Sequence, residues 1–311
     1  MTIEPDTNLF GFLGIDIERN GKEVQLTQKG LTDKVIRYLN LDKTVSKEST
    51  PAASSPLGSD KDGDPFDEEW SYPAAIGMLM YLSSNTRPDI QFAVHSASRF
   101  SHAPKKSHAR AVKRIARYLS ATTQGGTLSK GICFKPDLAS GLDMYVDADY
   151  AGLFGYEDDQ DPVSVKSRTG FVLTLFGCPV LWSSKLQTDI CLSSTAAEYV
   201  AFSMGMRELL PMRDLVKEIC VKLKLNQIKH SLVRSTVFED NQGALSLVNV
   251  PKMSPRNKYL ALKYHFFRNN IGEDKGIVAK YIRSAQQKAD IFTKGLSGAD
   301  FLRIRKLVMG W

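Results

Sequence analysis

The residues of this sequence best suited to chemistry are four acidic side chains that stand where predicted elements begin or end. Asp147 lies near the end of residues 142–149, whose alternating apolar and polar side chains predict a buried strand. Glu198 falls in the expected first turn of a helix capped by Ser and Thr, and Asp240 closes a β-branched strand. Asp290 stands near the start of a further predicted helix. Four carboxylates from four elements are therefore candidates for one shared site.

Such a cluster suits divalent metal chemistry. Mg²⁺ prefers hard oxygen ligands, and two such ions about 4 Å apart can hold the attacking and leaving oxygens of a phosphodiester. Without metal, clustered carboxylates would repel one another and raise each other's pKa. Two Mg²⁺ ions, or Mn²⁺ in their place, are therefore candidate cofactors, and Asp147, Glu198, Asp240 and Asp290 are candidates for both the metal ligands and the catalytic residues.

The elements that must position these residues alternate in the manner of an α/β domain. Three meandering strands precede helix–strand units, which predicts a mixed sheet with helices on its faces. Asp147 and Asp240 would then end neighbouring parallel strands, at the edge where open α/β sheets bind ligands. The predicted strands are 142–149, 170–176, 179–183, 233–240 and 276–282, and the predicted helices are 194–223, 242–248, 259–269 and 286–296.

The chain divides into four segments by composition. Residues 1–45 contain a predicted hairpin and a helix capped by Thr27, too small to be a domain. Residues 46–69 are rich in Ser, Pro, Asp and Gly and are typical of a linker. Residues 70–126 predict a mostly helical module, and residues 127–311 hold the α/β domain.

Positive charge is concentrated in two places. The net charge is +7, yet residues 251–311 alone hold 13 Lys and Arg against 4 Asp and Glu, a net +9. The helix predicted at 104–121 has an apolar face, and basic residues occupy much of the rest of its surface. We expect that basic face either to contact phosphates or to be merely solvated; its residues are Lys105, Lys106, Arg110, Lys113, Arg114 and Arg117.

Membrane insertion is not expected. The chain has 311 residues with 42% hydrophobic content, which is enough for a core. No apolar run approaches the roughly 20 residues of a membrane span, and a basic-then-apolar signal sequence is absent from the N-terminus.

From Asp147 onward the sequence resembles the ribonuclease H domain at the end of the Pol polyprotein of Ty1/copia-type retrotransposons. Two upstream runs, 12–15 (FLGI) and 87–90 (RPDI), are similar to the segment after the polymerase active site of that polyprotein. The downstream matching runs are 147–152 (DADYAG), 166–170 (KSRTG), 191–195 (CLSST), 197–199 (AEY), 239–242 (EDNQ), 263–265 (KYH) and 289–294 (ADIFTK).

The resemblance implies a ribonuclease H-like five-stranded sheet preceded by a reverse-transcriptase palm remnant and a thumb- or connection-like module. It implies hydrolysis of the RNA strand of RNA–DNA hybrids, with Asp147 bridging both metal ions. Glu198 and Asp240 would hold the ion nearer the leaving oxygen, and Asp290 the ion nearer the attacking water. Polymerase activity is not expected.

Further expectations concern partners and location. Asn241 and Gln242, beside Asp240, are expected to contact nucleic acid. The expected protein partner is the upstream reverse transcriptase part of the polyprotein. By analogy, the location would be cytoplasmic virus-like particles or the nucleus.

The sequence departs from the family pattern at Ala196, Tyr259, Phe266 and Gly295, where the family usually has an acidic residue, His, often His, and Pro. Relatives of this fold also carry a histidine in the loop before the last carboxylate, which here is residues 283–287. Two alternatives to an active hydrolase therefore stay open. One is a catalytically inactive nucleic-acid-binding relic, and the other is a structural subdomain of a reverse transcriptase.

Overall fold

The computed structural model describes residues 11–41, 46–123, 130–158, 160–225, 233–249 and 265–311. Contacts divide the chain into two compact units. Unit 1 comprises Met1–Ala52, Asp62–Lys135 and Met309–Trp311, and unit 2 comprises Ala53–Lys61 and Pro136–Val308. These bounds cut across the four segments expected from composition. Part of the expected linker belongs to unit 2 because Ser59 donates its amide to Glu157 Oε2 at 2.9 Å.

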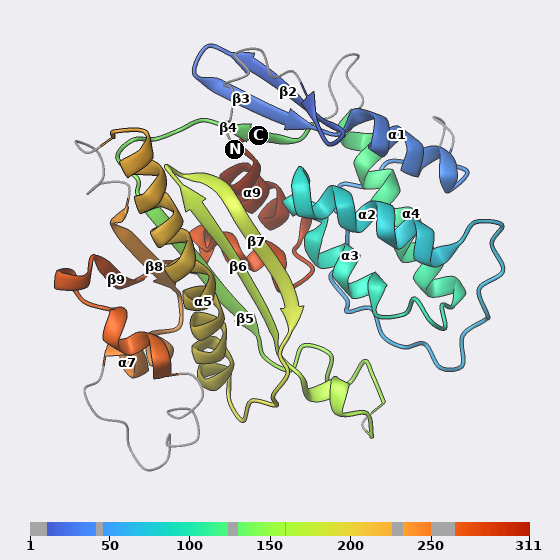
Figure 1. Cartoon of the computed structure of the whole chain (residues 1–311). Helices are drawn as coiled ribbons and strands as arrows, with labels where there is room; N and C mark the ends of the chain where they lie inside the picture. The colour runs from blue at the N-terminus through green and yellow to red at the C-terminus, as the bar shows by residue number, and fades with distance from the viewer. Residues whose placement is uncertain (1–10, 42–45, 124–129, 159, 226–232, 250–264) are drawn as a thin grey trace. The chain divides into compact units, whose positions relative to one another are not determined.

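Unit 1 combines a small antiparallel sheet with helices (Figure 1). The predicted hairpin is present, and Gly21 forms its turn with a φ of 60°. The strands, in sheet order, are β1 (Gly11–Phe12), β2 (Ile15–Asn20), β3 (Glu23–Thr27) and β4 (Ile132–Phe134). The helices are α1 (Lys29–Tyr38), α2 (Tyr72–Asn85), the 3₁₀ turn η1 (Pro88–Ile90), α3 (Gln91–Ser98) and α4 (Lys106–Thr123).

A buried ion pair ties α4 to the turn before α3. The Arg87 guanidinium lies 2.8 Å from Asp89 Oδ2, and both side chains are 1% exposed or less. Tyr118 of α4 donates its hydroxyl to the same Asp89 oxygen at 2.5 Å. A buried charge pair needs such additional hydrogen bonds to offset the desolvation of its members.

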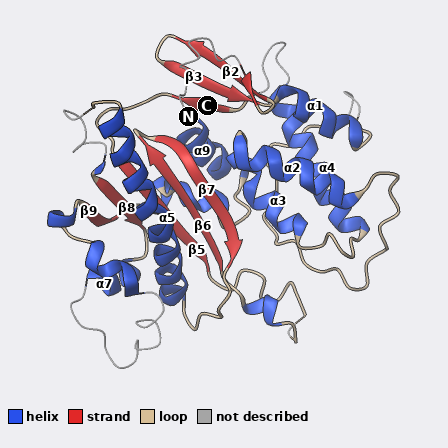
Figure 2. Cartoon of the chain, in the orientation of Figure 1, coloured by secondary structure: helices blue, strands red, loops and turns tan. Residues whose placement is uncertain are grey.

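Unit 2 is built on the expected mixed five-stranded sheet, with strand order β7-β6-β5-β8-β9 (Figure 2). β5 is parallel to β8, and β8 is parallel to β9, whereas β6 and β7 run antiparallel to their neighbours. The strands are β5 (Leu142–Asp149), β6 (Arg168–Leu175), β7 (Cys178–Leu186), β8 (Ser235–Glu239) and β9 (Ile277–Tyr281). The helices are α5 (Ser194–Lys222), α7 (Gln242–Asn249) and α9 (Gly298–Met309), with 3₁₀ turns η2 (Pro162–Val165), η4 (His265–Asn270), η5 (Glu273–Lys275), η6 (Ser284–Gln286) and η7 (Lys288–Phe292).

The core of unit 2 lies between the sheet and α5 (Figure 1). Val146 of β5, Phe171 of β6 and Val237 of β8 are buried against Phe202 of α5 in one apolar cluster. Side chains alternate between the two faces of a strand, so the odd-numbered residues of β5, including Asp147, point away from this cluster. This alternation therefore places the Asp147 carboxylate on the face of β5 opposite to the apolar cluster.

Several local predictions need correction. The helix expected at 286–296 is interrupted, because the backbone of Gln287 is extended between η6 and the 3₁₀ turn η7, while its side chain bonds the backbone of β5. Glu198 is the fifth residue of α5, so it lies beyond the first turn. Thr27 pairs with Asp16 in the hairpin, which leaves Gln28 at the helix N-terminus without a side-chain cap.

The helix expected at 259–269 is only partly described. Residues 265–270 form η4, and the remainder of 259–269, including Tyr259, lies outside the described residues. Within the described ranges, every helix is too short or too polar to cross a membrane.

Candidate metal centre

Three of the predicted carboxylates meet where two parallel strands end. Asp147 lies in β5, and Asp240 follows directly after its parallel neighbour β8. Glu198 reaches the same place from α5. One carboxylate oxygen from each of Asp147, Glu198 and Asp240 lies within 4.8 Å of the other two. The strand order alone explains the meeting of the two aspartates, because parallel strands present their carboxyl ends at one edge.

Glu198 lies beside Asp147 because α5 packs closely on β5. Ser193 caps α5 by accepting the amide of Ala196 on its hydroxyl oxygen at 3.1 Å. Further along, an added Cβ on Gly205 would lie 2.5 Å from Cγ1 of Val146, so only glycine allows this approach. The backbone amide of Ala148 donates to the Glu198 carboxylate, which holds it beside the strand that carries the aspartate.

The fourth predicted carboxylate, Asp290, belongs to η7. Asp290 is 8% exposed, and its carboxyl group lies close enough to Asp147 for the charge of that residue to raise its pKa. Gln287 anchors the segment, since its Nε2 donates to the backbone oxygen of Val146 at 2.8 Å. Thr293 is fully buried and donates its hydroxyl to Oδ2 of Asp147. Asp290 thus lies beside Asp147, next to the three carboxylates that have oxygens within 4.8 Å of one another.

Lys294, which follows η7, lies beside two of these carboxylates. The Nζ atom of Lys294 lies 3.1 Å from Oδ1 of Asp290 and 3.9 Å from Oδ2 of Asp147. Lys294 belongs to the matching run 289–294, but no role was expected for it from the sequence. Its i, i+4 spacing from Asp290 is a signal that pattern reading could have used.

Burial and mutual repulsion shift the titration of these groups, as the clustering predicted. Burial, followed by the charges of Glu239, Asp147 and Asp240, raises the pKa of Glu198 to about 11. Burial and the charge of Asp147 raise the pKa of Asp290 to about 7. Burial also raises the pKa of Asp147, against the opposing influence of Lys294. A bound divalent cation would reverse these shifts, because it favours ionised carboxylates.

A fifth carboxylate, Glu239, is fully buried beside the cluster. It belongs to the matching run 239–242 but was not among the four expected metal ligands. One of its oxygens accepts the amide of Asn241 at 2.9 Å, whereas Oε2 has no hydrogen-bond partner among the described residues. Burial raises the pKa of Glu239 well above its ordinary value.

The donor set fits a hard divalent cation. All the clustered donors are carboxylate oxygens, the ligands that Mg²⁺ and Mn²⁺ accept most readily. The buried Oε2 of Glu198 also lacks a hydrogen-bond partner within the described part of the chain. An unpaired buried carboxylate oxygen is costly, and a cation would satisfy it.

Comparison with known proteins gives this geometry a context. No protein-family model and no solved structure matches the chain. The sequence is 33% identical over 300 residues, 96% of the chain, to the retrovirus-related Pol polyprotein from transposon RE2 of Arabidopsis thaliana. It is 32% identical over 304 residues to the corresponding polyprotein from transposon TNT 1-94 of Nicotiana tabacum. The chain is related to retrotransposon Pol polyproteins.

This Pol-related chain spans only 19% of the RE2 polyprotein, about a fifth of its length. A shorter match is also present. Over 137 residues, 44% of the chain, the sequence is 38% identical to secreted RxLR effector protein 161 of Plasmopara viticola, of which 87% is covered.

The basic helix α4 of the Pol-related chain is largely neutralised by acidic residues in unit 1. Lys113 Nζ lies 2.6 Å from Glu68, and Arg114 lies 3.1 Å from Glu48. Lys106 pairs with Asp64 and Asp67, and Lys105 donates to the backbone oxygen of Gly63. Arg110 is exposed and Arg117 is partly exposed. The role of this face in nucleic-acid binding stays a prediction.

Asn241 and Gln242, also expected to touch nucleic acid, stand at the start of α7. The Asn241 side chain accepts the amide of Ala244 at 2.9 Å and so caps the helix, while Gln242 is exposed. The loop that precedes the last carboxylate supplies Ser284, whose hydroxyl donates to Oδ2 of Asp240 at 2.7 Å. In this Pol-related chain a serine therefore orients Asp240 from the loop where we had noted the missing histidine.

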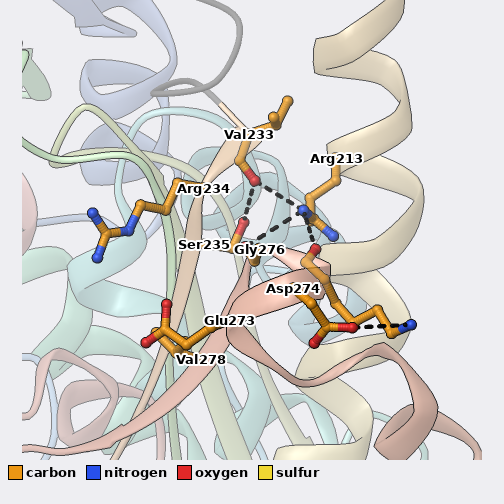
Figure 3. A pocket seen from close by; sticks show the side chains of 9 residues that line it. Arg213, Val233, Arg234, Ser235, Glu273, Asp274, Gly276 and Val278 are labelled. Atoms are coloured by element: carbon orange, nitrogen blue, oxygen red, sulfur yellow. Dashed lines mark hydrogen bonds and ion pairs between the residues drawn. The ribbon is translucent and has the colours of Figure 1, made fainter.

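A separate pocket of about 450 Å³ lies at the amino-terminal ends of β8 and β9 (Figure 3), whereas Asp240 follows the carboxyl end of β8. Arg213 of α5 lines it and donates to the backbone oxygens of Val233 and Lys275 at 3.0 and 3.1 Å. Since the guanidinium joins α5 to the starts of both strands, we assign it a structural role.

Proposed function

We propose that this chain hydrolyses the RNA strand of RNA–DNA hybrids with two divalent metal ions, as the ribonuclease H part of a retrotransposon Pol polyprotein. The observation that carries the proposal is the group of carboxylates at the ends of β5 and β8, in a chain related to Pol polyproteins. Neither feature would be sufficient alone, because acidic clusters are common and Pol polyproteins contain several activities.

The residues that would hold the metal ions are Asp147, Glu198, Asp240 and Asp290. When bound, the two ions would supply positive charge at the phosphate and at the attacking and leaving oxygens. The protein would contribute the placement of the ligands. Thr293 and Ser284 each fix one aspartate oxygen by donating a hydroxyl hydrogen bond, which restricts the directions available to the remaining lone pairs.

Substrate binding would depend on shape and charge rather than on base sequence. Hybrid duplexes are recognised largely through backbone phosphates and 2′-hydroxyls. The excess positive charge of residues 251–311 suits such a polyanion.

The test is cleavage of an end-labelled RNA–DNA hybrid by the purified chain, with and without Mg²⁺. We expect RNA-strand cutting that Asp147→Asn and Asp240→Asn each reduce by at least about a thousandfold, because each removes a metal-ligating charge. Asp214→Asn is the matched control, since Asp214 is an exposed aspartate of α5 that pairs only with Lys217 in the described structure. Cutting that persists in both site variants would contradict the assignment.

A second candidate is a structural subdomain that works only with the upstream part of a Pol polyprotein. The observation that favours it is the exposure of Phe12 and Leu13, at 61% and 69%, on the N-terminal hairpin. Exposed neighbouring apolar side chains are typical of a surface that another protein segment covers. If the chain alone is inactive but becomes active on co-expression with the upstream part, this second function is favoured.

A further inference from the structure

Lys294 places a positive charge against two residues that the proposed function makes metal ligands. Its Nζ atom lies 3.1 Å from Oδ1 of Asp290 and 3.9 Å from Oδ2 of Asp147. These oxygens are also the ones a divalent ion would need. The inference below rests on the proposed metal centre and concerns what this lysine does there.

The backbone next to Lys294 is fixed, but its side chain is not enclosed. Thr293 is fully buried and donates its hydroxyl to Asp147, and the Lys294 amide donates to the backbone oxygen of Asp290 at 3.4 Å. The Lys294 side chain is nevertheless 45% exposed. A flexible four-carbon stem with an open path to solvent lets the ammonium leave without disturbing the fold.

Two cations compete for the same pair of carboxylate oxygens, because their like charges repel each other. With no metal bound, the ammonium lies near both Asp147 and Asp290 and offsets the repulsion between their charges. When a divalent ion approaches, like charges repel and the ammonium must move away. The free energy of the lysine contacts is then lost, and the apparent metal affinity falls by the corresponding factor.

We propose that Lys294 is a resident cation of the metal centre, which holds Asp147 and Asp290 in place when metal is absent and competes with divalent ions for them. Lys294 is thus a positioning residue that sets the metal concentration at which the site fills.

If Lys294 formed only a structural ion pair, its removal would change the metal affinity in the opposite direction. If Lys294 only braces the site, its removal should loosen the carboxylates and weaken metal binding. If it competes, its removal should strengthen metal binding. Ion pairs with a half-exposed member are worth roughly 1 kcal/mol, so about a fivefold change in affinity is expected.

The experiment is direct Mn²⁺ titration of the full chain at constant ionic strength, with free Mn²⁺ followed by electron paramagnetic resonance. We expect Lys294→Met to bind Mn²⁺ about fivefold more tightly than the unaltered chain and Lys294→Arg to stay within about twofold. Lys217→Met is the matched control, because Lys217 is 41% exposed and its Nζ atom lies 2.8 Å from a single aspartate on α5. Lys294→Gln replaces the methionine variant if circular dichroism shows that the latter does not fold.

The outcomes separate this inference from the proposed function. Equal or weaker Mn²⁺ binding by the Lys294 variant, with binding that Asp147→Asn abolishes, overturns the resident-cation role and leaves the metal centre intact. If neither the unaltered chain nor the Lys294 variant binds Mn²⁺, both proposals fail.

Discussion

Gly170 lies directly opposite Asp147 in the antiparallel ladder between β5 and β6. A Cβ atom added to Gly170 would lie 2.6 Å from Cγ2 of Thr293 and 2.8 Å from Cβ of Phe292. The missing side chain therefore makes room for the segment that carries Asp290 and Lys294. The glycine therefore affects the candidate metal centre through packing, since it has no side chain that could bind a metal ion.

Gly170→Ala should therefore displace η7. We expect a loss of about 1–3 kcal/mol in the free energy of unfolding, because overpacking a buried contact forces backbone shifts. Hybrid cleavage should fall by more than the unfolded fraction explains. Denaturant unfolding and cleavage rates measure the two effects. In the control Gly30→Ala, the added Cβ meets nothing within 4 Å, so stability should be unchanged or rise by up to about 1 kcal/mol.

Thr293→Val tests the hydroxyl that orients Asp147. Valine keeps the shape of the buried side chain but cannot donate a hydrogen bond, so the aspartate oxygen loses its partner. We expect metal binding and cleavage to weaken by about 10- to 100-fold, as is typical when a residue that orients a metal ligand is replaced. Thr293→Ser should restore most of the loss.

The control for this substitution lies in β6. Thr174 is equally buried, but its hydroxyl donates to the backbone oxygen of Asp143. Thr174→Val should therefore lower stability without lowering metal affinity beyond the error of the titration. If both valine variants bind metal equally well, Thr293 has no special relation to the site.

The pKa shifts predict how pH affects the metal-free protein. The folded pKa values of Asp290 and Glu198 are raised to about 7 and about 11, above those of the unfolded chain, which lie near 4. The folded state therefore binds more protons between these limits, and stability should fall as pH rises. The slope approaches about 1.4 kcal/mol per pH unit for each such group.

Urea unfolding at a series of pH values, in the presence of a chelator, would measure this slope. Glu198→Gln should flatten the decline above pH 7, because it removes the group that titrates highest. Saturating Mn²⁺ should flatten it as well, since metal favours the ionised carboxylates. A metal-free stability that rises from pH 5 to pH 8 would contradict the inferred protonation.

The ion pairs of α4 predict unequal effects on nucleic-acid binding. Arg110 is exposed, whereas Lys113 is held 2.6 Å from Glu68. If this face contacts phosphates, Arg110→Ala should weaken hybrid binding more than Lys113→Ala. Only Arg110→Ala should also reduce the slope of log affinity against log salt concentration, by about one. Fluorescence anisotropy at several salt concentrations separates the two. Equal effects would mean that the Glu68 pair opens on binding.

Sequence patterns were most informative where the structure depends on local alternation. The bounds of β5 agree with the prediction because its apolar and polar residues alternate over its full length. The parallel pairing of β5 and β8, and hence the meeting of Asp147 and Asp240, followed from the order of the elements.

Prediction failed where distant contacts decide the conformation. Residues 286–296 have a helical pattern, yet the hydrogen bond from Gln287 to Val146 joins residues 141 positions apart and fixes 3₁₀ turns instead. The pairing of Lys113 with Glu68 and the burial of Glu239 likewise depend on tertiary packing. Local sequence patterns do not predict such contacts.

The hydrogen bond from Thr293 to Asp147 spans 146 positions of the chain. During synthesis on the ribosome, Asp147 must therefore emerge long before the residues that complete its surroundings. A product that stops ahead of residue 287 would contain three of the four proposed ligands without the segment that orients them. Synthesis of residues 287–294 would then be the step that completes the surroundings of Asp147 in the proposed metal centre.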